Sequence, residues 1–244
     1  MLVSAWKSDE EIRQSLAEKQ NIAVFSCNIC ANLNGTGGRR GLQKMKRLLK
    51  QWGKTITVAR TVNVCCSEEI MRQKLRLYID PVRDRCDALV MLSCAGGVKC
   101  AFLCRPGIPV VAALDSTGSG VVATSMSPAE AGLCVTCGHC VLTYTGGICP
   151  LAACPARRKY GPCKKAPAEG GACALDPDRD CVWKEIEKKG DMAALAGLAR
   201  LHADPAYTRS APIDPGSRPR LIRRFSGWFM ARIPGLSGLV DLVK

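Results

Sequence analysis

The sequence predicts an α/β fold in which a small doubly wound parallel sheet precedes an irregular cysteine-rich module and a helical or extended C-terminal tail. Strand and helix patterns alternate over residues 21–125, whereas residues 126–182 hold eight cysteines separated by Gly and Pro. The chain has 244 residues, 47% of them hydrophobic, which is enough to bury a core. Its 16 cysteines and net charge of +14 are the features that bear on function.

Each element of the predicted sheet domain has its own local signal. Residues 7–20 have a helical pattern, with Ser8 and Glu11 at capping-box spacing. Apolar or β-branched runs predict strands at 21–26, 55–64, 88–93 and 108–114, and apolar residues at helical spacing predict helices at 39–52, 67–78 and 183–202. The predicted parts are an N-terminal helix (1–20), a doubly wound α/β domain (21–125), a cysteine-rich cluster-binding module (126–182), and a helix, linker and tail (183–244).

Composition narrows the class of protein. No apolar run approaches the roughly 18 to 20 residues that span a bilayer, and the first residues turn charged without the apolar stretch of a secretory signal. A cytoplasmic location is therefore expected, where thiols stay reduced and so many cysteines indicate metal rather than disulfides. With only two histidines, His139 and His202, the expected sites are all-thiolate: four-cysteine zinc or iron–sulfur clusters.

Cysteines follow three of the predicted strands. Cys27 comes after the first strand, Cys65 and Cys66 after the second, and Cys94 after the third. The carboxyl ends of parallel strands meet at one crevice, and Cys30 completes a Cys-x₂-Cys pair with Cys27. We expect a four-thiolate cluster held by Cys27, Cys30, Cys94 and either Cys66 or Cys65. The alternative is that these cysteines are small buried hydrophobes, which is the interpretation given to Cys86, Cys100 and Cys104.

The glycines that follow the first strand do not indicate a nucleotide site. Gly35, Gly37 and Gly38 lack the G-x-G-x-x-G spacing, and no acidic residue lies between Lys19 and Glu68 to bind a ribose hydroxyl. We expect them instead to let backbone amides approach a cluster.

The second cysteine block is denser. A Cys-x₂-Cys-x₂-Cys run precedes a Cys-Pro pair, which partly matches the bacterial ferredoxin pattern and favours a cubane cluster. His139, inside the run, is expected to be a loop residue rather than a ligand. Eight cysteines can complete two four-thiolate sites, so two clusters, or one cluster and a zinc ion, both fit, and the spacing does not assign each thiol to a metal. The predicted ligands are Cys134, Cys137, Cys140, Cys149, Cys154, Cys163, Cys173 and Cys181.

Several of these motifs resemble a known family. The stretch Gly132–Pro150 resembles the methylenetetrahydrofolate reductase C-terminal family, as do Gly161–Cys163 and Asp180–Trp183. The likeness extends to the motifs around Cys27, Cys66 and Cys94 and covers most of residues 1–185. This family includes the MetV-type iron–sulfur subunit of the acetogen-type reductase. The chain departs from the family at Ser26-Cys27-Asn28, where Gly-Cys-Gly is common, and at the two lysines after Cys163.

The resemblance implies a non-catalytic electron-transfer subunit with two to three [4Fe-4S] clusters and no catalytic residue of its own. It would take electrons from ferredoxin, or from a larger heterodisulfide-reductase-like or bifurcating complex. It would pass them to the flavin of a catalytic subunit that reduces methylenetetrahydrofolate to methyltetrahydrofolate in the Wood–Ljungdahl pathway of an anaerobe. The alternatives are a zinc-binding scaffold of a methyl-transfer complex without a redox role, and an enzyme whose active site is the strand-end cluster.

The excess positive charge is concentrated. Eight basic residues and no acidic one lie between Arg39 and Arg60. They form either a solvated face or a docking surface for an acidic electron carrier, and without interleaved aromatics nucleic acid is not an expected partner. The tail at 221–244 combines Phe, Trp and Arg, and we expect it to dock on a partner protein in preference to a membrane surface.

Overall fold

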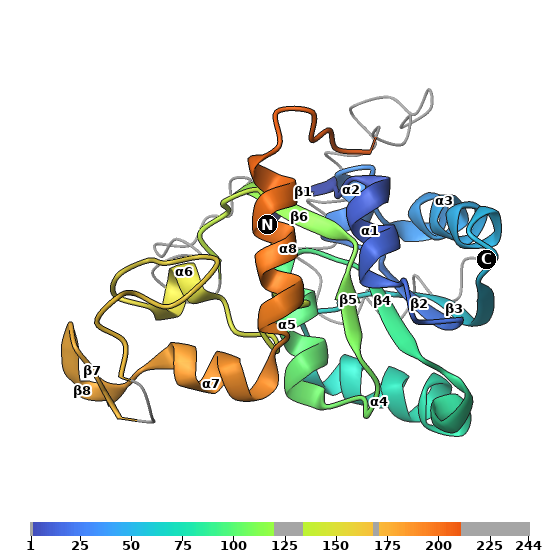
Figure 1. Ribbon diagram of the computed structural model, residues 1–244. Coiled ribbons are helices and arrows are strands. Elements are labelled where there is room, and N and C mark those ends of the chain that lie inside the picture. The colour runs from blue at the N-terminus through green and yellow to red at the C-terminus, as the bar shows by residue number, and fades with distance from the viewer. Residues whose placement is uncertain (1, 120–133, 168–170, 211–244) are drawn as a thin grey trace.

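A computed structural model gives the arrangement of residues 2–119, 134–167 and 171–210 (Figure 1). Four parallel strands form the central sheet in the order β3-β2-β4-β5. Their bounds are β2 (Asn21–Cys27), β3 (Thr55–Val62), β4 (Ala88–Leu92) and β5 (Val110–Ala112). The predicted parallel α/β sheet is therefore confirmed, and the strand order reverses between β2 and β4, which is where such sheets bind ligands.

Helices cover both faces of this sheet. From β2 the chain moves outwards to β3 and then back past β2 to β4, so right-handed crossovers put the connecting helices on opposite faces. Figure 1 shows α3 on one side and α4 with α5 on the other. Their bounds are α3 (Gly38–Gln51), α4 (Glu68–Tyr78), the 3₁₀ helix η1 (Asp80–Arg85) and α5 (Ala95–Cys104). The short helix α2 (Cys30–Leu33) lies between β2 and α3.

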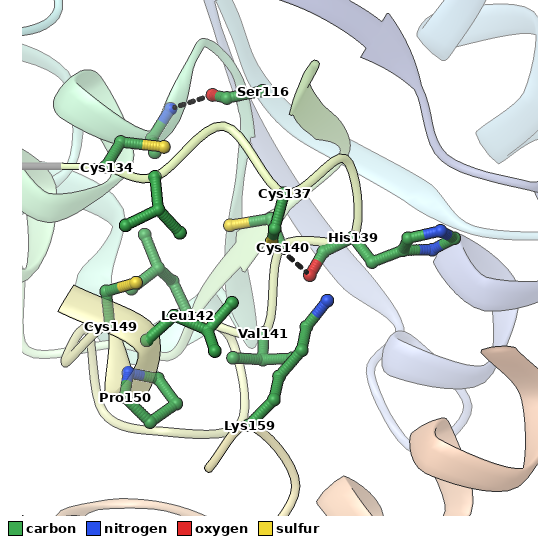
Figure 2. A pocket seen from close by; sticks show the side chains of 13 residues that line it. Ser116, Cys134, Cys137, His139, Cys140, Val141, Leu142, Cys149, Pro150 and Lys159 are labelled. Atoms are coloured by element: carbon green, nitrogen blue, oxygen red, sulfur yellow. Dashed lines mark hydrogen bonds between the residues drawn. The ribbon is translucent and has the colours of Figure 1, made fainter. Parts of the chain in front are cut away.

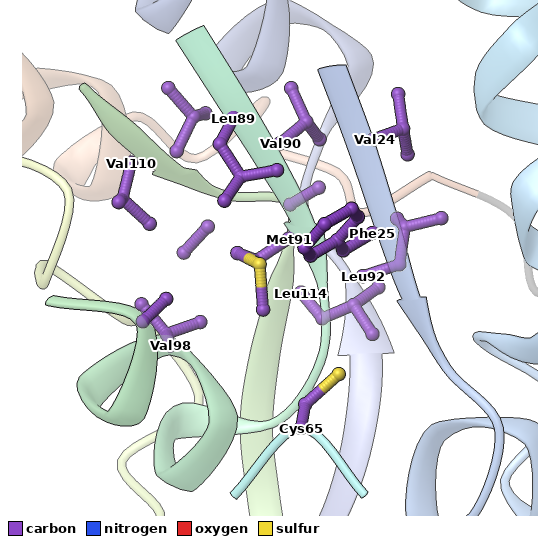
Figure 3. Close-up of a cluster of buried hydrophobic side chains, with 14 of the residues drawn as sticks. Val24, Phe25, Cys65, Leu89, Val90, Met91, Leu92, Val98, Val110 and Leu114 are labelled. Atoms are coloured by element: carbon purple, nitrogen blue, oxygen red, sulfur yellow. The ribbon is translucent and has the colours of Figure 1, made fainter. Parts of the chain in front are cut away.

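The two central strands carry the main core. Every residue of β4 is buried, and so is every residue of β2 after Asn21, as expected for strands covered on both faces. Figure 3 shows their side chains packed with those of Val98 from α5 and Val110 from β5. Cys65 lies in the same cluster, so the core extends to the carboxyl ends of the strands.

The N-terminal segment contains a strand that the sequence pattern did not predict. β1 (Leu2–Trp6) pairs antiparallel with β6 (Leu114–Ser119), which follows directly on β5. The single strand predicted at 108–114 is thus two shorter strands in different sheets. The N-terminal helix is confirmed as α1 (Asp9–Ser15), although it is shorter than predicted. Ser8 caps it by accepting a hydrogen bond of 3.0 Å from Glu11 N–H.

The cysteine-rich region is mostly turns. Its regular elements are the short helix α6 (Pro150–Ala153) and a hairpin of β7 (Ala172–Cys173) and β8 (Asp176–Asp180). A second, smaller apolar cluster joins this region to the helices that follow it. Its buried residues are Val141, Cys154, Cys181, Trp183, Ile186, Leu195 and Leu198.

The helix predicted at 183–202 is two helices, α7 (Val182–Lys189) and α8 (Met192–Ala203). They separate at Gly190, where a Cβ atom would lie 2.3 Å from the carbonyl oxygen of Tyr144, and Asp191 caps α8 through Ala194 N–H. The chain therefore turns where only glycine fits. No helix in the described ranges combines the length and apolarity needed to cross a bilayer. The predicted tail at 221–244 lies outside these ranges.

Candidate metal centres

The structure brings the five cysteines that follow the strands together. Cys27 is the last residue of β2, Cys65 and Cys66 follow β3, and Cys94 is the N-cap of α5 after β4. Cys30 begins α2 beside them. Each interacts electrostatically with at least one other thiol of the set. We call Cys27, Cys30, Cys65, Cys66 and Cys94 the strand-end group.

Ionisation within the strand-end group is uneven. A hydrogen bond from Cys65 holds the pKa of Cys27 at about 6, and backbone N–H donors add to this effect. Burial raises the pKa of Cys30 to about 12, and the neighbouring charges of Cys94, Cys27 and Cys66 raise it further. Several thiolates in so buried a place repel one another, and bound metal would offset that repulsion.

The two candidates for the fourth ligand differ in their surroundings. Cys65 is fully buried and hydrogen-bonds to Cys27, whereas Cys66 is exposed. Both residues lie at the carboxyl ends of the strands. The structure therefore does not decide which of them is the fourth ligand, and neither did the sequence.

One of the two glycines at the start of α5 leaves room for Cys65 beside the helix. A Cβ atom on Gly97 would lie 2.7 Å from Cβ of Cys65 and 2.0 Å from Oγ of Ser93. On Gly96 it would meet only ordinary contacts, 3.7 Å from Cβ of Cys66 and 3.8 Å from Sγ of Cys94.

We predict that Gly97→Ala displaces Cys65 and, if the strand-end group binds metal as expected, that the variant loses it, about four iron atoms for a cubane. Metal analysis of the purified protein checks this, and Gly96→Ala is the matched control on the same helix turn. Equal iron content in both variants would contradict the prediction.

A second set of four thiols faces one small cavity. Cys134, Cys137, Cys140 and Cys149 line a pocket of about 20 Å³ whose other walls are largely apolar (Figure 2). Figure 2 shows the labelled sulfur atoms directed towards this space. Burial raises the pKa of Cys134, and the charges of Cys149 and Cys137 raise it further. We call these four residues the loop group; one of them, Cys137, is exposed and the others are buried or half-buried.

The backbone of the Cys-x₂-Cys-x₂-Cys run is held in an unusual shape. Thr136 has φ 49° and Gly138 has φ 75°, both in the left-handed region, which β-branched residues such as threonine rarely adopt. Thr136 N–H donates to Sγ of Cys134 over 3.2 Å. Strain of this kind, about 1–3 kcal/mol for such a residue, persists where the surroundings impose it and clusters at functional sites.

The remaining four predicted ligands are less closely gathered. Cys154 and Cys181 are buried in the same apolar cluster, where Cys181 precedes α7. Cys173 is buried at the end of β7, and beside this strand the N–H of Cys181 donates to the carbonyl oxygen of Gly171 over 2.9 Å. Cys163 is half-buried in a turn closed by Ala166 N–H. The structure thus places Cys154 and Cys181 in one apolar cluster. A shared metal site for all four cysteines stays a prediction.

The donor chemistry of the strand-end and loop groups fits zinc or an iron–sulfur cluster. Within the described ranges, no group of three or more Cys, His, Asp or Glu side chains stands ready to hold a metal ion. The strand-end and loop groups nevertheless consist of thiols alone, which are the ligands of zinc and of iron–sulfur clusters. Cys86, Cys100 and Cys104 are buried in the main core, in agreement with the structural role predicted for them.

A buried charge network lies beside the loop group, and the sequence patterns did not reveal it. Lys7 Nζ is 2.5 Å from Oε1 of Glu11 and 2.9 Å from Oδ1 of Asp115, and the side chains are only 2%, 3% and 0% exposed. On the far side, Oε2 of Glu11 accepts from Tyr207 over 2.8 Å and lies 3.0 Å from Nε2 of His202. The i, i+4 spacing of Lys7 and Glu11 was the available signal.

Electrostatics keep this network charged. Burial alone would lower the pKa of Lys7, but the carboxylates of Asp115 and Glu11 more than offset it and raise that pKa above its ordinary value. Burial likewise opposes ionisation of Glu11, yet Lys7 and the hydrogen bond from His202 hold its pKa at about 2. His139 lies in a loop as expected, but it is half-buried rather than on the solvent side, with its Nδ1 atom buried and its ring packed on that of His202 at a centroid distance of 4.5 Å.

One family model matches part of the chain. The model of a family described as methylene-tetrahydrofolate reductase C terminal matches residues 112–207. This range includes the loop group, the four cysteines after it and both histidines, whereas the strand-end group precedes it. The resemblance noted in the sequence is confirmed over this range. Neither the curated proteins nor the solved structures contain a match.

Proposed function

We propose, from the match of residues 112–207 to the methylene-tetrahydrofolate reductase C-terminal family, that this chain is the iron–sulfur electron-transfer subunit of a methylenetetrahydrofolate reductase complex. The observation that carries the proposal is the convergence of the loop group on one apolar-walled cavity within the matched range. Thiols would suit zinc as well, but the Cys-x₂-Cys-x₂-Cys run followed by Cys-Pro favours an iron–sulfur cluster there.

Each thiol group would hold one metal centre. The loop group would hold a [4Fe-4S] cluster through Cys134, Cys137, Cys140 and Cys149. The strand-end group would hold another through Cys27, Cys30, Cys94 and either Cys66 or Cys65. A third cluster, or a zinc ion, would use Cys154, Cys163, Cys173 and Cys181. When bound, a [4Fe-4S] cluster takes up and releases single electrons.

The protein's own residues would supply the environment for that chemistry. The loop group lies against Val141 and Leu142, which exclude water from most of the cavity. One thiol is exposed in each group, Cys66 in the strand-end group and Cys137 in the loop group. Each would mark the side from which a redox partner can approach. The catalytic flavin would belong to a second subunit.

Metal analysis under anaerobic conditions tests this proposal. The purified chain should be brown, contain iron and sulfide, and give EPR signals after reduction. Adding it to the flavin-containing subunit should restore electron transfer to methylenetetrahydrofolate. A colourless chain that holds only zinc would instead indicate the scaffold role, and turnover by the chain alone would indicate an enzyme.

We further propose that an acidic electron carrier such as ferredoxin docks on α3. The helix carries six of the eight basic residues between 39 and 60 and no acidic one. Arg39 and Arg40 are exposed in its first turn, where positive charge opposes the helix dipole at a cost of about 0.3–1 kcal/mol each. Just before that turn, a Cβ atom on Gly37 would lie 2.8 Å from the carbonyl oxygen of Cys27, so the helix begins beside the strand-end group.

Reversing charge on α3 should slow reduction of the chain by an acidic carrier. We expect Arg39→Glu with Arg47→Glu to lower the second-order rate at low salt by about tenfold or more, and high salt to remove most of the difference. Stopped-flow absorbance measures the rate. An acidic residue at 39 favours the helix dipole, so a slower rate would not reflect unfolding. Arg76→Glu on α4, on the opposite face of the sheet, is the control, and an equal effect there would contradict the proposed surface.

A further inference from the structure

The buried charge network is attached to the loop group through the backbone of one cysteine. Lys7 Nζ donates to the carbonyl oxygen of Cys140 over 2.8 Å, and the N–H of Cys140 donates to Oδ1 of Asp115 over 2.7 Å. Both backbone polar groups of Cys140 are therefore held by opposite charges, and these charges themselves form an ion pair of 2.9 Å. Cys140 is fixed between an ammonium and a carboxylate.

The same network also fixes the preceding turn. Arg209 donates from its guanidinium to the carbonyl oxygen of Gly138 over 2.5 Å, and its Nε lies 3.5 Å from Oδ2 of Asp115. Asp115 thus connects two points of the Cys137–Cys140 turn. This turn has the left-handed backbone at Gly138 described above.

Stability alone does not account for these charges. Removing two ions from water commonly costs as much as their attraction returns, and an apolar pair of the same size is often at least as stable. Lysine is almost never fully buried unless it is paired, and Lys7 comes from a segment 133 residues away from Cys140 in the sequence. The position of the charge beside four thiols is what distinguishes this ion pair from an ordinary one.

We propose that Lys7 is a positioning residue for the loop group: it orients the peptide of Cys140 and places a permanent positive charge beside the thiolates. This inference rests on the proposed function. A positive charge in a buried, weakly screened place favours the more negative, reduced state of a bound cluster, and the Asp115 carboxylate opposes it. Lys7 therefore raises, and Asp115 lowers, the reduction potential of this site.

The test is an EPR-monitored redox titration of the full chain and four variants. Lys7→Gln should shift the potential of one cluster to a more negative value, and Lys7→Arg should leave it close to that of the unsubstituted protein. Asp115→Asn keeps an oxygen for Cys140 N–H while it removes a negative charge, so it should shift the potential in the positive direction. Lys54→Gln is the matched control, because Lys54 also binds backbone carbonyls, those of Leu16 and Ala17 at 2.8 and 3.2 Å.

Opposite shifts for Lys7→Gln and Asp115→Asn support the inference, because loss of a merely structural contact has no reason to reverse sign. Unchanged potentials, or shifts in the same direction, overturn it. If Lys7→Gln does not assemble its cluster, the Asp115→Asn titration decides: a positive shift supports the inference and any other result overturns it.

Failure of the proposed function is a separate outcome. A chain that binds zinc and no iron would overturn the electron-transfer role while leaving the inference about Lys7 open to the same variants. Competition with a chromogenic chelator then measures zinc affinity. Lys7→Gln should weaken zinc binding by the loop group and Asp115→Asn should strengthen it, whereas equal affinities would overturn the inference.

Discussion

Replacing Cys140 by serine is expected to remove one whole cluster, about four iron atoms per chain, and to leave the other iron in place. Cys140 is buried, it lines the cavity of the loop group, and both of its backbone polar groups are held, by Lys7 and by Asp115. A serine hydroxyl is a poor substitute for a thiolate towards iron in an all-sulfur site. Iron and sulfide analysis together with EPR spin quantification measures the loss.

A matched control is available in the main core. Cys86 is also buried, and its sulfur lies near the carbonyl oxygens of Asn21 and Ala88, at 3.7 and 3.5 Å, where a serine hydroxyl can take its place. Cys86→Ser should retain all of the iron. Equal iron loss in both variants would indicate general destabilisation, and full iron content in Cys140→Ser would contradict the ligand assignment.

If the chain binds metal as proposed, its removal is expected to loosen the cysteine-rich region while the parallel sheet stays folded. Residues 134–166 are mainly turns, and the apolar cluster that supports them has few buried members, so metal would supply much of their stability. Trypsin cleavage after the exposed Arg157, Arg158, Lys164 and Lys165 should become at least about tenfold faster, which corresponds to a loss of only about 1.4 kcal/mol.

The sheet domain provides the internal control for that experiment. Arg39 and Arg47 are equally exposed trypsin sites, but they lie on α3, whose apolar face packs on β2 and β3. Their cleavage should change little when the metal is removed. Mass spectrometry of the fragments separates the two regions, and simultaneous cleavage of both would show that the metal stabilises the entire chain.

Local signals in the sequence were sufficient where an element depends on its own residues. The strands β2 and β4 are continuous apolar runs, and α4 lies within the helix predicted at 67–78, where the hydroxyl of Ser67 caps it by accepting from Ile70 N–H. The convergence of Cys27, Cys65, Cys66 and Cys94 also followed from the sequence, because parallel strands all end at the same edge.

Features that depend on distant partners were not predictable in this way. β1 is stabilised by pairing with β6, more than a hundred residues later, and its five residues have no distinctive pattern of their own. Lys7 has the appearance of a surface lysine until Asp115 and Cys140 are placed beside it. The break between α7 and α8 was missed although its signal is local: Gly190 ends one helix and Asp191 caps the next through Ala194 N–H, which the single helix predicted over 183–202 overlooked.

The first residues of α5 have a consequence for the two thiol groups taken together. Cys94 belongs to the strand-end group, while the next residue, Ala95, lines the cavity of the loop group and donates its N–H to Ser116 over 3.0 Å. The two groups therefore adjoin neighbouring residues at the start of α5. If both groups hold clusters, an electron added to one would make reduction of the other less favourable, because the two negative charges repel each other across a short distance. The two centres would then be reduced anticooperatively.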